Sequence, residues 1–62
     1  MLIELPNKVG SIEIIELINV NHIVKIYNNG YVTKIYMDDG DIIHCTKPYK
    51  EVNDMVNEAL KS

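Results

Sequence analysis

The sequence predicts a small α+β fold, in which one C-terminal helix packs on one face of a small antiparallel β-sheet. Two turn motifs, Asn28-Asn29-Gly30 and Asp38-Asp39-Gly40, lie close together and are flanked by alternating, strand-like sequence. Turn residues between such segments are typical of β-hairpins. Only the segment after the second turn shows the three- and four-residue apolar spacing of an amphipathic helix. We expect residues 1–62 to form a single domain.

Two short strands are predicted before the meander, at residues 2–5 and 11–15. Pro6 is expected to end the first strand, and residues 7–10 supply turn residues. Residues 17–21 fit either a continued strand or one helical turn, and they are assigned as irregular.

The meander is predicted at residues 22–27, 31–37 and 41–45, which are rich in β-branched residues and tyrosine. A two-residue loop at the first turn would place Lys25 opposite Lys34, and like charges directly opposite each other destabilise a sheet. We therefore predict a three-residue loop with a left-handed glycine at each turn. The resulting pairs are Tyr27 with Tyr31, Ile23 with Ile35, Ile35 with Ile43, and Thr33 with Cys45.

This register divides the meander into two faces, both rich in apolar residues. The first is expected to carry Ile23, Lys25, Tyr27, Tyr31, Thr33, Ile35, Met37, Ile43 and Cys45. The second is expected to carry Val24, Ile26, Val32, Lys34, Tyr36, Ile42 and His44.

A helix is predicted from Tyr49 onward, with Pro48 in its first turn and Thr46 or Lys47 as its cap. Its apolar stripe consists of Tyr49, Val52, Met55, Val56, Ala59 and Leu60. We expect it to cover the first face, which carries a row of isoleucines across its middle.

The second face then needs another cover, and two are considered. One is the N-terminal hairpin, curled over the sheet. The other is a second copy of the chain, because a domain of this size buries only about 60% of its unfolded surface. The homodimer is preferred, and the seven residues of the second face are its predicted interface.

Composition argues against several functions. The net charge is −3 and there is no arginine, whereas nucleic-acid binders usually carry clustered basic residues. No apolar run approaches the roughly 20 residues of a membrane span. One cysteine and no N-terminal signal segment favour a reducing cytoplasm. Many isoleucines, asparagines and lysines beside one alanine indicate AT-rich codons, typical of a low-GC bacterium or its phage.

No pattern indicates catalysis, a metal or a cofactor. His44 and Cys45 are neighbours on a strand, so their side chains point to opposite faces and cannot form a nucleophile–base pair. His22 and His44 lack the further ligands of a closed zinc site. The aspartates near Gly40 lack the terminal glutamate of a calcium loop. The protein is therefore predicted not to be an enzyme.

From about Leu17 onward the chain resembles the FlbD-type flagellar protein family. The matching residues are Ile23 and Ile26 in HIVKI, Thr33 and Ile35 in TKI, Asp39-Gly40-Asp41-Ile42, and Glu51-Val52 with Val56. The chain is also similar to the second half of LytTR DNA-binding domains. Both resemblances imply a β-β-β-α arrangement. The chain departs from FlbD-type sequences at the N-terminal turn, and it lacks the basic residues that a LytTR domain brings to DNA.

These observations predict a small non-catalytic protein that binds a larger host protein as an inhibitor or regulator. In size, acidity and AT-rich composition the chain is similar to short phage-encoded inhibitors of bacterial immunity, such as those acting on Hachiman or Thoeris systems. The expected contacts are exposed tyrosines and acidic turns. Two alternatives remain open: an FlbD- or LytTR-like regulator, and a small-molecule sponge with a site at a dimer interface.

Overall fold

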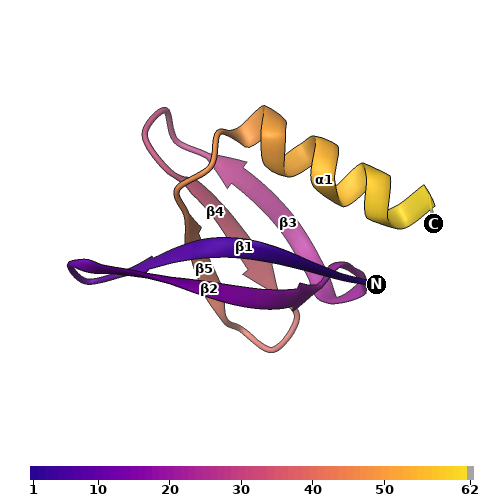
Figure 1. Ribbon diagram of the computed structural model, residues 1–62, viewed down its shortest axis with the longest axis horizontal. Helices are drawn as coiled ribbons and strands as arrows, with labels where there is room; N and C mark the ends of the chain where they lie inside the picture. The colour runs from indigo at the N-terminus through magenta and orange to yellow at the C-terminus, as the bar shows by residue number, and fades with distance from the viewer. Residues whose placement is uncertain (62) are drawn as a thin grey trace.

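The computed structural model describes residues 1–61, which form one five-stranded antiparallel sheet and one C-terminal helix (Figure 1). The predicted α+β fold is therefore confirmed. The strands are β1 (Leu2–Val9), β2 (Ile12–Asn19), β3 (Ile23–Asn28), β4 (Thr33–Met37) and β5 (Ile42–Cys45). A single 3-10 turn, η1 (Val20–His22), links β2 to β3, and the helix α1 spans Tyr49–Lys61. The strand order across the sheet is β2-β1-β5-β4-β3.

The N-terminal hairpin is longer than the sequence predicts. Strand β1 continues through Pro6 to Val9, and the two-residue loop Gly10-Ser11 joins it to β2. Gly10 has φ +64°, the left-handed conformation that such hairpin loops require and that glycine adopts without strain. Pro6 is tolerated because β1 pairs with β5 only at Asn7, so most of its second side has no ladder to interrupt.

The segment assigned as irregular is ordered. Residues 17–19 continue β2, and η1 follows them. The side chain of Asn19 accepts a hydrogen bond from the Asn21 N–H at 3.0 Å, which ends the strand and begins the 3-10 turn.

The second hairpin loop is as predicted. Thr33 pairs with Cys45 and Ile35 with Ile43 across β4 and β5. The Gly40 N–H donates to the Met37 carbonyl at 3.1 Å, and Gly40 has φ +91°. This is the three-residue loop with a left-handed glycine.

The register predicted at the first hairpin loop is wrong. The loop spans residues 29–32, Asn28 pairs with Thr33, and Ile26 lies opposite Ile35. The side chain of Asn29 accepts hydrogen bonds from the backbone N–H groups of Tyr31 and Val32 at 3.0 and 3.1 Å, which stabilises the longer loop.

This register also avoids the contact between Lys25 and Lys34. Lys25 now lies opposite Tyr36, with its Nζ 4.9 Å from the centre of the tyrosine ring, and Lys34 lies opposite Tyr27. A cation above an aromatic ring is a favourable contact. Because side chains alternate along a strand, the shift moves Ile26 to the first face and Lys25 and Tyr27 to the second.

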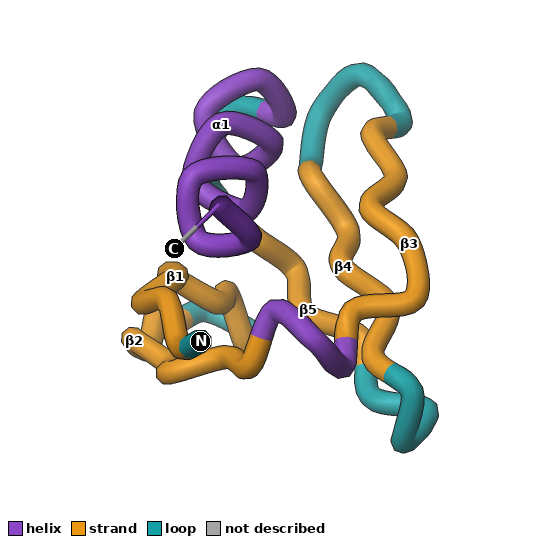
Figure 2. The backbone as a smooth tube through the Cα atoms, turned by 90° about the vertical axis from the view of Figure 1, so that its right-hand side faces the viewer, coloured by secondary structure: helices purple, strands orange, loops and turns teal. Residues whose placement is uncertain are grey.

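The sheet bends around α1, and the core fills its concave face. In Figure 1 the β1–β2 hairpin crosses the meander at a steep angle, and Figure 2 shows the helix between β1–β2 on one side and β3–β4 on the other. The helix contacts both β1 and β3. Of the predicted stripe, Val52, Val56 and Ala59 are buried and Met55 packs against the core, whereas Tyr49 and Leu60 are exposed. The strand and loop residues of the core are Leu5, Ile18, Val20, Ile35, Ile43 and Cys45.

The expected position of the helix is confirmed, since Val52 shares the core with Ile35 and Ile43. The N-terminal hairpin does not cover the second face. Leu5 and Ile18 point into the same core as the helix, so the hairpin extends the sheet and closes the concave side. The second face of the meander is the convex side of the sheet, and neither the helix nor the hairpin covers it.

Candidate binding surfaces

The seven residues of the predicted interface do not all lie on one face of the sheet. Lys34 pairs with His44 and Tyr36 with Ile42, so these four share the convex face, where Ile42 and His44 are exposed. Val24 is exposed at a break in the β3–β4 register, and Val32 lies in the loop between the strands. Ile26 is different. It packs against the core cluster, because of the register described above, and it does not lie on the convex face.

A second apolar surface lies on the N-terminal hairpin, outside the predicted interface. Strand β2 forms one edge of the sheet and pairs only with β1. Ile12, Ile15 and Leu17 are 60%, 63% and 65% exposed, and Ile14 is also exposed. Because side chains alternate, Ile12 and Ile14 lie on one face of the strand and Ile15 and Leu17 on the other. The edge of β2 is therefore apolar on both faces.

The two glutamates of β2 are engaged with the body of the sheet. Glu16 accepts a hydrogen bond from the Asn7 side chain at 2.8 Å. Glu13 accepts one from the Thr46 hydroxyl at 2.9 Å. Both acceptors therefore bond to groups on the β1 and β5 side of the strand, away from its free edge.

The sequence contains a signal for this edge that the predicted strand boundaries conceal. A glycine at a two-residue loop, with apolar residues continuing on both sides, indicates a long hairpin. The predicted strands end at Pro6 and at Ile15, so the predicted hairpin is shorter than the observed one and lacks Leu17 and Ile18. The β2 edge is long because β2 pairs with β1 along the whole of β1, from Leu2 to Val9.

An open groove of about 380 Å³ lies where the C-terminal half of β2 meets the β4–β5 loop. Its apolar lining consists of Leu17, Ile18, Met37 and Ile43. Its polar lining consists of Glu16, Asn19, His22, Asp38, Asp39 and Asp41.

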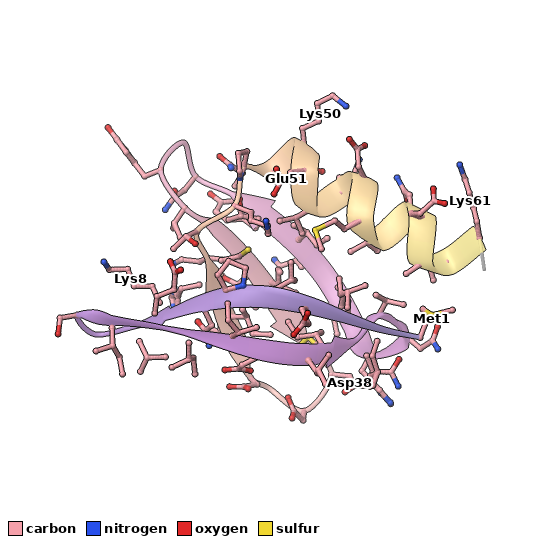
Figure 3. All side chains as sticks on the ribbon, viewed as in Figure 1. Met1, Lys8, Asp38, Lys50, Glu51 and Lys61 are labelled. Atoms are coloured by element: carbon pink, nitrogen blue, oxygen red, sulfur yellow. The ribbon has the colours of Figure 1, made fainter. Side chains whose placement is uncertain are left out.

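The acidic side of the groove is held by contacts between η1 and the β4–β5 loop. His22 Nδ1 lies 2.7 Å from Asp38 Oδ2, and the Asp38 N–H donates to the His22 carbonyl at 2.9 Å. Asp38 lies near the C-terminal end of β2 (Figure 3). The carboxylates give this groove a negative lining, which favours cationic groups over phosphates.

Three of the four tyrosines lie exposed at the other end of the meander, and we call Tyr27, Tyr31 and Tyr49 the tyrosine end. Figures 1 and 2 both show the β3–β4 loop beside the beginning of α1. The Thr33 hydroxyl joins these segments by donating to the Lys47 carbonyl at 2.9 Å. Tyr31 is 98% exposed. Its ring contributes almost no packing to the fold.

Chemically reactive groups are few in the part of the chain described. Cys45 is buried, and removal from water raises the pKa of its thiol, so the reactive thiolate is disfavoured. Within residues 1–61 no group of three or more His, Cys, Asp or Glu side chains is placed to hold a metal ion. None of the helices in that range is long and apolar enough to span a membrane.

The geometry thus offers an apolar strand edge, an acidic groove and an exposed aromatic end, which are features suited to binding. No protein-family model, curated protein or solved structure matches the chain.

Proposed function

We propose that the chain is a small, non-catalytic protein-binding module that acts as an inhibitor or regulator of a larger protein through the tyrosine end. The observation that carries the proposal is Tyr31, whose side chain is 98% exposed at the tip of the β3–β4 loop. Tyrosine is enriched in protein–protein interfaces and among the residues that contribute most to binding, which sit in well-packed pockets of the partner.

The loop that presents Tyr31 is supported without its ring. Asn28 accepts a hydrogen bond from the Gly30 N–H at 2.7 Å, and Asn29 accepts from Tyr31 and Val32. Gly30 has φ +97°, which a residue with a side chain rarely adopts. The backbone is thus held in place, which lowers the ordering cost when the aromatic side chain binds.

The larger protein that we propose is a bacterial defence enzyme, with the chain encoded by a phage. Support comes from the net charge of −3 and the composition typical of AT-rich codons. An acidic inhibitor suits a target whose own binding surface is basic, because complementary charge accelerates association.

The experiment compares the wild-type chain with Tyr31→Ala, each immobilised and exposed to lysates of defence-positive and defence-negative bacteria. One defence enzyme should be retained by the wild type from the first lysate alone. With that enzyme purified, Tyr31→Ala should weaken binding about 30-fold, which corresponds to a hot spot of roughly 2 kcal/mol. Leu60→Ala, which alters an exposed apolar residue at the far end of α1, is the matched control and should bind normally.

Equal binding by Tyr31→Ala and the wild type would contradict the proposed surface, and retention of no protein would contradict the proposed function. Recovery of DNA would instead favour the regulator that the FlbD and LytTR resemblances imply. A gel shift that weakens steeply with added salt would establish that outcome.

A further inference from the structure

The two edges of the sheet differ in how they are protected from pairing with another chain. Strand β3 is short, its register is broken between Ile23 and Lys25, and it carries a lysine. Irregular pairing and lysines are devices by which proteins protect an edge. Strand β2 spans Ile12–Asn19, pairs with β1 in unbroken register, and contains neither lysine nor proline. Only β2 therefore offers a long, regular and apolar edge.

The direction of the β2 backbone groups follows from the hairpin loop. Gly10 and Ser11 form a hydrogen-bonded turn, so Val9 and Ile12 are a hydrogen-bonded pair. Backbone groups alternate in direction along an antiparallel ladder. Those of Glu13, Ile15 and Leu17 therefore face the free side of β2, where they are available to a further strand.

We propose that this edge pairs with β2 of a second copy of the chain, antiparallel, with Ile15 opposite Ile15 of the second copy. The two sheets would then join into one continuous sheet across a two-fold axis. The proposal does not rest on the target-binding role of Tyr31, which lies on a different element.

The choice of a second copy follows from the self-complementarity of the strand. In an isologous antiparallel pair, one residue lies on the two-fold axis and faces itself. A centre at Glu13 or Glu16 would place two carboxylates directly opposite each other, which destabilises a sheet. A centre at Ile15 pairs Ile12 with Ile18 and Glu13 with Leu17, and no glutamate then lies opposite another.

The centre at Ile15 also gives the longer ladder. It pairs residues Ile12–Ile18 of each copy, whereas a centre at Ile14 pairs only Ile12–Glu16. On the convex side, Ile15 would then pack against its copy, and Leu17 would lie diagonally beside Ile15 of the second copy; both are more than 60% exposed in the single chain. On the concave side, Ile12 would lie opposite Ile18 of the second copy, and Ile14 would lie diagonally beside its own copy. Association covers apolar groups on both faces of β2 and satisfies its outward N–H and C=O groups.

The first test is the mass of the full chain by light scattering and sedimentation at micromolar concentration. The wild type should have twice the mass of one chain, and Ile15→Lys should halve it. Val24→Lys is the matched control, because Val24 is a β-branched residue that is 65% exposed on the opposite edge strand. This variant should keep the dimer. A monomeric wild type, or a dimer that survives Ile15→Lys, would overturn the proposal.

The second test addresses the register and does not depend on the folding of a lysine variant. Opposite residues of a hydrogen-bonded pair have Cα atoms about 5.5 Å apart, within reach of a disulfide. Ile15→Cys should therefore form disulfide-linked dimers under mild oxidation. Ile12→Cys, which is equally exposed but opposite Ile18 in this register, should not.

The wild type contains only the buried Cys45, so it is the control and should form no disulfide-linked dimer. Equal cross-linking at positions 12 and 15 would refute the register. If Ile15→Lys and Val24→Lys leave the mass of the dimer equally unchanged, the interface lies on neither edge strand and the proposal is overturned. Neither result would alter the binding expected of Tyr31, so the two proposals fail separately.

Discussion

At the scale of single residues, Asn7 connects the two parts of the sheet. Its buried side chain accepts a hydrogen bond from the His44 N–H at 3.0 Å and donates one to Glu16 at 2.8 Å. The ladder between β1 and β5 contains only the pair Asn7 and Cys45. A side chain therefore supplies the contacts that the short backbone ladder does not.

Replacing Asn7 should destabilise the protein through this junction. Asn7→Ala leaves the His44 N–H without its acceptor, and we expect a loss of about 1–3 kcal/mol in the free energy of unfolding. Urea unfolding at one fixed protein concentration measures it. Asn57→Ala, on the exposed side of α1, should stay within about 0.5 kcal/mol of the wild type. A similarly small effect at Asn7 would show that the junction is held by other contacts.

The raised pKa of the Cys45 thiol predicts how the free energy of unfolding changes at alkaline pH. Burial raises the pKa of its thiol above the ordinary value of 9.0, so the unfolded chain releases this proton at lower pH than the folded chain. The stabilisation is fully present below pH 9.0 and is lost as the pH rises through the folded pKa. Unfolding free energies measured in urea on both sides of pH 9.0 should therefore fall with increasing pH.

Cys45→Ala is the control for this effect, because it removes the titrating group. The variant should be less stable at every pH, owing to the cavity, but its stability should decline less between pH 9.0 and 10.5. Lys47, whose pKa is raised by its hydrogen bond to Glu51, loses its charge only above 10.5. An unchanged slope in Cys45→Ala would assign the alkaline loss to other groups.

At the scale of elements, the first hairpin of the meander decides which side chains enter the core. Ile26 packs against the core, while Val24 is exposed where the register is broken. The three-residue loop expected from the sequence would have placed both on the convex face. Both residues are β-branched and lie in the same strand, so they make a direct test of the register.

Ile26→Ala should lower the free energy of unfolding by about 2 kcal/mol, because it leaves a partly filled space beneath α1. Val24→Ala should change it by less than about 0.5 kcal/mol, as is usual at an exposed position. Thermal and urea unfolding of the two variants provide the comparison. Equal effects at both positions would be the outcome expected of the shorter loop and would contradict the observed register.

The helix and the second hairpin loop show what local sequence can determine. Apolar spacing indicated the buried residues Val52, Val56 and Ala59, since the period of a helix repeats within a few residues. Asp39 and Gly40 specified their loop for a similar reason: the Asp39 side chain accepts from the Asp41 N–H at 2.9 Å, and Gly40 is left-handed. In both cases the determining residues are neighbours within a few positions in the sequence.

At the scale of the whole molecule, the sheet closes around the helix on its concave side and leaves its other surfaces exposed. The strand order brings the N-terminal hairpin against β5, and α1 then fills the concave side. Lys50 and Lys61 on the outer side of α1 point away from the sheet (Figure 3). The exposed apolar residues include Ile12, Ile14, Ile15 and Leu17 on the outer strand of the hairpin and Ile42 on the convex face.

The local sequence pattern predicted only some of the residues that lie on the candidate surfaces. Of the seven residues expected on one face, Lys34, Tyr36, Ile42 and His44 share it, because their pairing depends on the loop that was predicted correctly. Ile26 does not, because its face depends on the other loop. The β2 edge was not anticipated, since its length depends on β1 continuing through Pro6.

The sequence by itself determined the α+β class, the helix with its buried stripe and the second hairpin loop, because each depends on short-range periodicity or on turn residues adjacent in the chain. The tertiary structure decided the register of β3, the single junction between β1 and β5, and the exposure of β2. These depend on pairing between segments far apart in sequence. A shift of one residue there reverses every side chain of a strand, yet it leaves the alternating pattern unchanged.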